Sequence, residues 1–217
     1  MTAAVVLVLA KAPVPGRVKT RLCPPATPEQ AARIAAAALL DTMDAVRATP
    51  GVQPVIALAG DPAATGIEHL LREIPVVGQR GASLGERIAA AHADTAGLFP
   101  DTPVLQIGMD TPQISAGLLG ECRDRLRQPG TDAVLGPADD GGWWLLGLRD
   151  PLRAVVVTPV PTSRSDTGAR TRQALAEHGL RTTDVPALAD VDTMPIARTV
   201  AAGLPGSRFA AAVEQVR

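Results

Sequence analysis

The chain has 217 residues, 46% hydrophobic content and a formal net charge of −1, with no block of like charges. This balance allows a sizeable core and argues against a broad nucleic-acid surface. With aromatics at 2% and no tyrosine, the core must consist of Ala, Val, Leu and Ile. Cys23 and Cys122 form no close-spaced metal motif, so we expect free thiols in a reducing cytoplasm. The apolar stretch 3–10 lacks a positive leader and is too short to span a membrane, which favours a buried first strand.

Short apolar runs alternate with longer helical patterns along the chain. Strands are predicted at 5–9, 54–59, 74–78, 104–107, 132–136 and 143–148. Helices are predicted at 28–48, 63–72, after a loop at 79–85 through residue 95, at 113–126, at 166–178, and in the tail after residue 205. The alternation predicts a single α/β domain over residues 1–217, built on a mostly parallel sheet.

The strand predicted at 104–107 leads into Gly108 and Asp110. In an open α/β sheet, ligands gather outside the carboxyl ends of the strands. A carboxylate delivered there by a rigid strand is well placed to hold Mg²⁺, which prefers oxygen ligands and carries substrate phosphates. In the competing interpretation Thr111 is a helix N-cap, Pro112 is the first helical residue, and Asp110 only ends the turn.

The loop after the first strand, KAPVPGRVKTRL, carries four cations before the first acidic residue of the chain: Lys11, Arg17, Lys19 and Arg21. Its prolines favour extended backbone, so Arg17, Lys19 and Arg21, spaced by two, are predicted to point the same way. Converging cations suit a polyphosphate, because Arg and Lys supply charge-assisted hydrogen bonds to its oxygens. The alternative is a solvated basic loop. The glycines are too few for a Walker loop.

A second motif, GQRGASLGER at 78–87, places two glycines and a serine just before a helix. Its backbone donors would let a nucleotide base or ribose approach. The alternative is a capped helix start with Glu86 in the first turn.

Two acidic motifs follow. In GPADDGGWWLLG, the Asp-Asp-Gly-Gly run predicts a turn, and Trp143 and Trp144 should face opposite sides of a strand, one toward the core and one toward a cleft. Asp139 and Asp140 are candidates for binding a sugar or acting as a base, although aspartates are also common in turns. In the second motif, alternation would put Asp190 and Asp192 on one side of an extended segment, suited to share a metal with Asp110.

Taken in order, AKAPVPGRVKTRL, GASLGER, GMDTP, GPADDGGWWLLGL and DVDT resemble a bacterial glycosyltransferase-like family, the radical-SAM/selenodomain-associated transferases. That family is related to the phospholactate guanylyltransferases of deazaflavin-cofactor synthesis and, more distantly, to molybdenum-cofactor guanylyltransferases. The resemblance covers nearly the whole chain. It implies one Rossmann-like domain of the glycosyltransferase-A type with a mixed sheet.

The resemblance also implies residue roles. The implied residues are Asp110, Asp190 and Asp192 for the metal, Lys11, Lys19 and Arg21 for phosphates, and Gly81, Ser83 and Gly85 for the base. The sequence departs from the family pattern on the acceptor side. Two tryptophans stand where tyrosine is frequent, and the segment 161–170 lacks the Trp-Ser pair that usually precedes the late helix.

We therefore expect a cytoplasmic transferase that uses an activated nucleotide and Mg²⁺ or Mn²⁺. In the leading hypothesis, a phosphate oxygen of a small acceptor attacks the α-phosphorus of a nucleoside triphosphate and releases pyrophosphate. Such an acceptor is already anionic at neutral pH, so positioning and charge neutralisation would carry the catalysis. Trp144, Arg164 and Arg170 are predicted to meet the acceptor, the arginines through its charge.

Two alternatives stay open. One is a glycosyltransferase that uses a nucleotide-diphosphate sugar, with Asp139 or Asp140 as the base for a hydroxyl acceptor. The other is a nucleotide-binding regulator without turnover. Besides the nucleotide and the acceptor, the expected partners include a second copy of the chain in a homodimer; nucleic acid and a membrane span are not expected.

Overall fold

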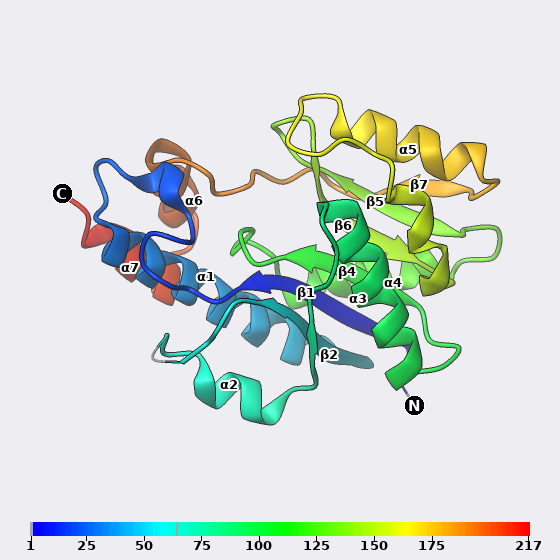
Figure 1. Ribbon diagram of the computed structural model, residues 1–217, viewed down its shortest axis with the longest axis horizontal. Coiled ribbons are helices and arrows are strands. Elements are labelled where there is room, and N and C mark those ends of the chain that lie inside the picture. Colours follow the sequence, from blue (N-terminus) through cyan, green and yellow to red (C-terminus); the bar gives the residue numbers. More distant parts are fainter. Residues whose placement is uncertain (1, 64) are drawn as a thin grey trace.

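The computed structural model describes residues 2–63 and 65–217 and contains a seven-stranded sheet with helices on both faces (Figure 1). The strands are β1 (Ala4–Lys11), β2 (Val52–Ala59), β3 (Val76–Gly78), β4 (Val104–Gly108), β5 (Ala133–Pro137), β6 (Trp143–Leu148) and β7 (Thr182–Asp184). Their order is β3-β2-β1-β4-β6-β5-β7, and β6 runs antiparallel to both of its neighbours. The predicted mixed, mostly parallel α/β sheet is confirmed.

Helices connect most of these strands. The α-helices are α1 (Pro28–Arg47), α2 (Glu68–Glu73), α3 (Leu84–Leu98), α4 (Ala116–Arg127), α5 (Thr167–Glu177), α6 (Met194–Ala202) and α7 (Arg208–Glu214), and the 3-10 helices are η1 (Thr20–Leu22) and η2 (Pro151–Val157). The helix predicted at 63–72 begins only at Glu68, and residue 64 within that range lies outside the described residues. Neither β7 nor α6 was predicted. The three polar residues of β7 have no strand pattern and pair only with the edge of β5.

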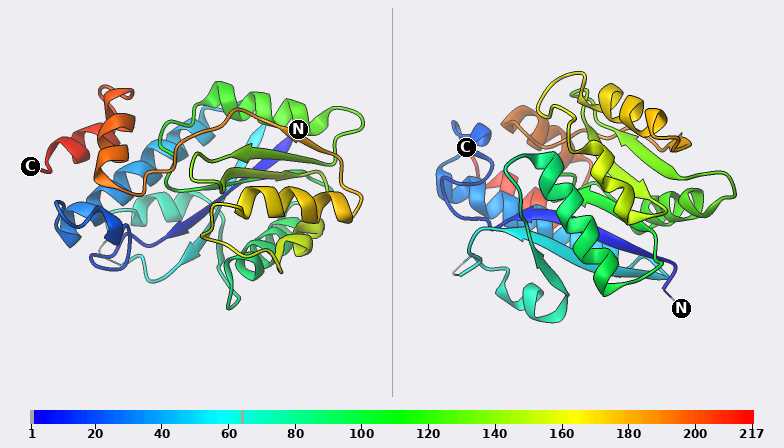
Figure 2. Two further views of the ribbon diagram at one scale, coloured as in Figure 1. Left: turned by 90° about the horizontal axis from the view of Figure 1, so that it is seen from above. Right: turned by 45° about the vertical axis from the view of Figure 1, so that its right-hand side comes forward.

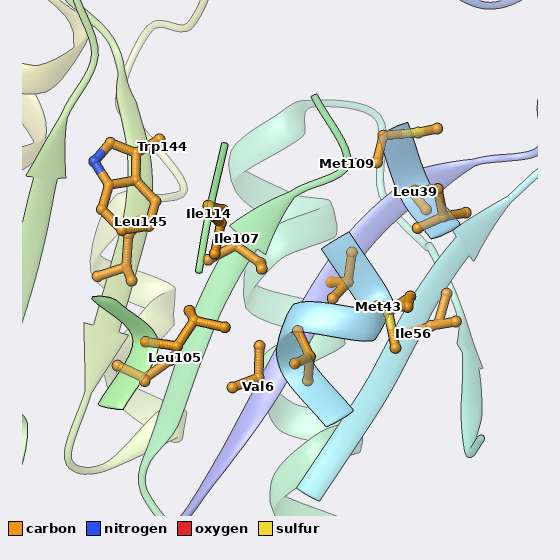
Figure 3. Packing of buried hydrophobic residues seen from close by; sticks show 14 of the residues in the cluster. Val6, Leu39, Met43, Ile56, Leu105, Ile107, Met109, Ile114, Trp144 and Leu145 are labelled. Atoms are coloured by element: carbon orange, nitrogen blue, oxygen red, sulfur yellow. The ribbon is translucent and has the colours of Figure 1, made fainter. Parts of the chain in front are cut away.

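The core lies on both faces of the sheet, which explains the unbroken apolar run of β1. Val6 and Val8 pack in the cluster under α1 and α4, whereas Val5 and Leu7 face α3. A strand that is buried on both sides needs apolar residues at every position. Figure 3 shows the first of these clusters, with Met43 of α1 among the side chains of the central strands.

Local signals set the starts of the two long helices. The Thr27 hydroxyl accepts a hydrogen bond from the Gln30 amide, the Gln30 side-chain oxygen accepts one from the Thr27 amide, and Pro28 opens α1. Ser83 and Glu86 form the same reciprocal cap at the start of α3. These capping boxes satisfy backbone donors that a helix otherwise leaves free.

A separate apolar cluster joins α6 and α7 to α1 at one end of the molecule, near the C-terminus (Figure 2). Phe209 of α7 is fully buried in it. Leu22 of η1 and Val191 belong to the same cluster. The loop that follows β1 and the segment that contains Asp190 and Asp192 are therefore packed against the same apolar side chains. No helix in the described part of the chain is both long and apolar enough for a membrane span.

Candidate active site

Asp110 lies just beyond the carboxyl end of β4, as predicted from the sequence. Its carboxylate folds back over Gly108, where a Cβ atom would lie 2.5 Å from Asp110 Oδ1. The interpretation of Thr111 as an N-cap is wrong, because α4 begins at Ala116 and the cap is the hydroxyl of Ser115. Asp110 is 34% exposed and therefore available to a ligand.

The basic loop after β1 is folded differently from the expectation. The chain turns at residues 15–17, and Lys19 has left-handed backbone with φ 47°, followed by η1. The expected extended loop with three cations on one side is therefore wrong. Lys19 and Arg21 converge on Asp192, whereas Arg17 is exposed and forms no ion pair within the described residues.

Lys19 is the centre of this arrangement. Its Nζ lies 2.9 Å from Asp110 Oδ2 and 2.9 Å from Asp192 Oδ1, and its side chain is only 12% exposed. Arg21 Nη1 lies 3.0 Å from Asp192 Oδ2. Burial acts to lower the pKa of Lys19, but the two carboxylates outweigh burial and raise it, so the ammonium stays charged.

The segment that carries Asp190 and Asp192 is irregular chain and not the extended strand expected from alternation. It is tied to the end of β4, since the Val191 amide donates to the Asp110 carbonyl at 3.0 Å and Gln113 Nε2 donates to the Ala189 carbonyl at 2.5 Å. These two contacts bring the late acidic motif against Asp110, as predicted.

The two late aspartates differ in charge state. Burial raises the pKa of Asp190 to about 8, and the neighbouring carboxylates of Asp110 and Asp140 act in the same direction. Burial would also raise the pKa of Asp192, but Lys19 and Arg21 outweigh it and lower that pKa. Asp190 therefore holds a proton near neutrality, whereas Asp192 is ionised.

The donor set of Asp110, Asp190 and Asp192 has the chemistry that Mg²⁺ or Mn²⁺ requires, because all three supply hard oxygen ligands. Among residues 2–63 and 65–217, no three His, Cys, Asp or Glu side chains converge on one metal position. Instead, the ammonium of Lys19 lies between the carboxylates of Asp110 and Asp192, where a metal ion would bridge them. The residues fit the metal chemically, but they are not preassembled around it.

The glycine-rich motif before α3 is largely used by the fold. Glu86 accepts hydrogen bonds from the Ala82 and Ser83 amides, which confirms the capped-helix interpretation. Gly85 is buried, and a Cβ there would lie 2.7 Å from the Val157 carbonyl of η2, so we remove it from the candidate base contacts. Gly81, with φ +127°, and Ser83 are exposed.

Gln79, which was not predicted as a site residue, lies near the carboxyl ends of β1 and β2. Its Nε2 donates to the Ala10 carbonyl at 2.9 Å and to the Ala57 carbonyl at 2.8 Å, at the ends of β1 and β2. A lone glutamine in a loop carries no sequence signal for this role, because both acceptors are distant in the chain.

The Asp-Asp-Gly-Gly turn joins β5 to β6, as predicted. Asp140 Oδ1 accepts from the Gly142 amide at 2.8 Å. Gly141 has φ +87° and packs directly against the Ser165 carbonyl, leaving no room for a side chain. Both aspartates are exposed, and Asp140 is near enough to Asp190 to raise its pKa.

The two tryptophans do face opposite sides, but Trp144 takes the core side. It is 2% exposed, its indole covers Gly136, and its Nε1 donates to the Pro186 carbonyl at 2.9 Å. Figure 3 shows it beside Leu145 in the apolar cluster. The expected substrate contact of Trp144 is therefore corrected: a buried ring offers no surface to a ligand. Trp143 is half-buried against Thr171 of α5.

The remaining predicted cations fall into two groups. Arg164 and Arg170 both pair with Asp166, at 3.1 and 2.7 Å, at the start of α5. Lys11 and Arg17 are exposed near the end of β1, and neither forms a salt bridge within the described residues. These two side chains are free to meet an incoming anion.

Solved structures share this fold. A Desulfovibrio desulfuricans G20 protein, provisionally described as a nucleotide-diphospho-sugar transferase, matches with a TM-score of 0.84 at 24% identity, covering 100% of this chain and 99% of that one. CMP:2-keto-3-deoxy-manno-octonic acid synthetase complexed with CTP matches with a TM-score of 0.59 at 14% identity, covering 97% and 99%. Rv0371c of Mycobacterium tuberculosis H37Rv, in complex with manganese, matches with a TM-score of 0.52 at 19% identity, covering 98% and 100%.

The chain therefore has the nucleotide-diphospho-sugar transferase fold of the glycosyltransferase-A type. It belongs to the family described as "Uncharacterized protein conserved in bacteria (DUF2064)", whose profile matches residues 42–164. That match contains Asp110 and the Asp-Asp-Gly-Gly turn, whereas the basic loop, Asp190 and Asp192 lie outside it. A comparison with curated proteins finds no match. The predicted relationship to the guanylyltransferases and to the radical-SAM/selenodomain-associated transferases stays a prediction.

Proposed function

We propose that this protein is a nucleotidyltransferase, which joins the nucleoside monophosphate part of a triphosphate to a small phosphorylated acceptor and releases pyrophosphate. One observation carries the proposal: Asp110 and Asp192 meet Lys19 and Arg21 where β1 and β4 end, beside the free cations Lys11 and Arg17. The fold adds support, since the similar structure bound to CTP belongs to a synthetase of a CMP-linked sugar acid.

In this proposal, the cations of the first loop hold the β- and γ-phosphates, which become the leaving pyrophosphate. Lys11 and Arg17 are available without breaking any ion pair, and Arg21 is 72% exposed and free to turn outward. Asp110, Asp190 and Asp192 would hold Mg²⁺ or Mn²⁺, which neutralises charge at the α-phosphate when bound. Charge-assisted hydrogen bonds to the departing oxygens lower the barrier without a protein base.

The acceptor would bind on the other side, between the Asp-Asp-Gly-Gly turn and the start of α5. Arg164 and Arg170 share the single carboxylate of Asp166, so these three side chains together carry one net positive charge beside the exposed carboxylates of Asp139 and Asp140. An acceptor phosphate would replace part of that pairing and present an oxygen that is already ionised. The arginine pair, which shares one carboxylate, supports a phosphorylated acceptor.

Glycosyl transfer from a nucleotide-diphosphate sugar is the second candidate. It is favoured by the full-length similarity to the Desulfovibrio protein and by the exposed carboxylates of Asp139 and Asp140 at the rim. Either aspartate would serve as the base that a hydroxyl acceptor needs.

The leaving group separates the two candidates. Pyrophosphate release is measured across the four common nucleoside triphosphates with a panel of phosphorylated acceptors, and nucleoside-diphosphate release is measured from common sugar nucleotides. We expect pyrophosphate, only when a triphosphate and an acceptor are both present. Nucleoside-diphosphate release from a sugar nucleotide, with no pyrophosphate from any triphosphate, would replace the first candidate by the second.

A further inference from the structure

Lys19 stands out because its ammonium fills the place that a metal would need. Its Nζ lies 2.9 Å from Asp110 Oδ2 and 2.9 Å from Asp192 Oδ1, and the side chain is largely shielded from solvent. The left-handed backbone of Lys19, held between the turn at 15–17 and η1, aims the side chain at both carboxylates. The sequence contains only two lysines, Lys11 and Lys19, whereas all its other basic side chains apart from histidine are arginines.

We propose that Lys19 is an internal cation which occupies the metal position in the ligand-free protein and must leave it when a divalent metal binds. The inference rests on the proposed function for where the ammonium then goes, namely the phosphates of the nucleotide. The competition between Lys19 and the metal, however, does not depend on which reaction the site performs.

The competition follows from geometry and charge. A divalent metal takes carboxylate oxygens at about 2.1 Å. The ammonium of Lys19 lies 2.9 Å from one oxygen of Asp110 and 2.9 Å from one oxygen of Asp192, so it stands where a metal that bridges these two carboxylates would lie. A lysine ammonium is a compact point charge on a flexible stem, so it can fill such a position and also vacate it; the planar fork of arginine is less suited. Leu22 and Val191 are buried in the cluster under α6 and α7, so the side chain can swing while the backbone of both segments stays in place.

A consequence is cooperative binding. Metal alone must displace Lys19 and leaves the ammonium without a partner beside a new positive charge. A polyphosphate offers replacement oxygens for the ammonium, so metal and nucleotide should each strengthen the binding of the other by the same factor.

The first test uses Mn²⁺ alone, followed by the electron paramagnetic resonance signal of the free ion. Lys19→Met should bind Mn²⁺ at least about tenfold more tightly than the wild type, because the competing ammonium is gone. Lys11→Met is the matched control: it removes the same charge from the same rim without uncovering the carboxylates, and its affinity should change by less than about threefold. If Lys19→Met binds Mn²⁺ no better than Lys11→Met, or if neither binds it, the proposal is overturned.

The second test follows the ammonium itself in the wild-type protein, so it does not depend on any variant folding. The two lysines are acetylated with an amine-reactive ester and quantified by peptide mass spectrometry. Without metal, Lys19 should react at least about tenfold more slowly than Lys11, because it is shielded and ion-paired. Saturating Mn²⁺ should raise the rate at Lys19 and leave Lys11 unchanged. Bound Mn²⁺ with an unchanged Lys19 rate would contradict displacement.

These results are separable from the proposed function. Tighter Mn²⁺ binding by Lys19→Met together with no pyrophosphate release from any triphosphate would retain the competition and reject nucleotidyl transfer. Normal pyrophosphate release with no effect of Lys19→Met on Mn²⁺ affinity would do the reverse.

Discussion

At the scale of single residues, the site is a balance of charge. The carboxylates of Asp110 and Asp192 face the ammonium of Lys19, and Asp192 also faces the guanidinium of Arg21, whereas Asp190 holds a proton near neutrality. A divalent cation added here would favour the ionised form of Asp190, because opposite charge lowers a carboxyl pKa. The side chains are thus paired with one another, and a ligand that binds to them has to exchange these pairs.

Asp110→Asn tests the metal role. We expect the variant to lose Mg²⁺-dependent triphosphate binding, because the lost charge matters more to a hard cation than the retained shape. Its melting temperature should stay within about 4 °C of the wild type, because Lys19 keeps its ion pair with Asp192 when Asp110 loses its charge. Isothermal calorimetry with and without Mg²⁺ measures the binding. Asp101→Asn, an exposed aspartate in the turn before β4, is the control. Ordinary Mg²⁺ dependence in Asp110→Asn would argue that Asp110 is not a ligand.

Gly108→Ala tests the placement of the same carboxylate. The new Cβ would lie 2.5 Å from Asp110 Oδ1, so the side chain of Asp110 must move while the fold is spared. We expect metal-dependent triphosphate binding to weaken at least about tenfold with little change in melting temperature. Gly78→Ala at the end of β3 is matched, because a Cβ there meets nothing within 4 Å. Equal affinities in the two variants would show that the position of the Asp110 carboxylate is not critical.

At the scale of elements, the C-terminal helices serve the site although they contribute no charged group to it. Leu22 of η1 and Val191 are buried with Phe209 of α7, so the loop of Lys19 and the segment of Asp192 rest on one apolar support. On the opposite face of the sheet, Gly85 has no side chain and lets α3 pack closely against η2. Residues outside the site therefore set its geometry through packing.

Phe209→Ala tests this support. Removing a fully buried ring should cost about 3–5 kcal/mol of unfolding free energy. We expect hydrogen exchange to rise more in residues 19–23 and 189–193 than in β1 and β4, because Leu22 and Val191 belong to the apolar cluster that loses the ring of Phe209. Phe99→Ala, a half-buried phenylalanine at the end of α3, is the control and should leave exchange in both segments unchanged. A uniform rise in exchange over the whole chain would contradict a local support.

At the scale of the whole molecule, one buried group makes stability depend on pH. His92 of α3 is fully buried, and neither ring nitrogen has a hydrogen-bond partner among the described residues. Burial lowers the pKa of His92 from the ordinary value of 6.5 to about 3. Between these two pH values the unfolded chain binds a proton that the folded protein does not. The unfolding free energy that depends on neutral His92 is therefore fully present above pH 6.5 and is lost as the pH falls toward 3.

His92→Leu should remove this dependence. Relative to the variant, the wild type should lose about 2–3 kcal/mol of unfolding free energy between pH 7 and pH 4.5, at about 1.4 kcal/mol per pH unit below 6.5. Urea unfolding at a series of pH values measures the unfolding free energy of both proteins. The carboxylates that both proteins share titrate alike, so their contribution cancels in the difference. His69→Leu replaces an exposed histidine in α2 and should follow the wild type. Parallel curves for the wild type and His92→Leu would contradict the assignment.

Features that depend on neighbouring residues in the chain were predictable before the fold was known. The apolar runs predicted β1 and β4, because strands buried on both faces need continuous hydrophobic residues. The motif before α3 predicted a capped helix start with Glu86 in its first turn, and the structure has this cap. A glycine and an aspartate after a buried strand placed Asp110 at the ligand-binding edge of the sheet.

Features that join distant parts of the chain arise only when the chain folds. Lys19 meets Asp110 across 91 positions and Asp192 across 173, and no local pattern encodes such pairings. The three polar residues of β7 become a strand only because β5 offers an open edge. Alternation indicated that one of the two tryptophans enters the core, but not which one; the close approach of β5 at Gly136 selects Trp144. Backbone preference acts locally, whereas burial and charge pairing are settled by elements that meet only when the chain folds.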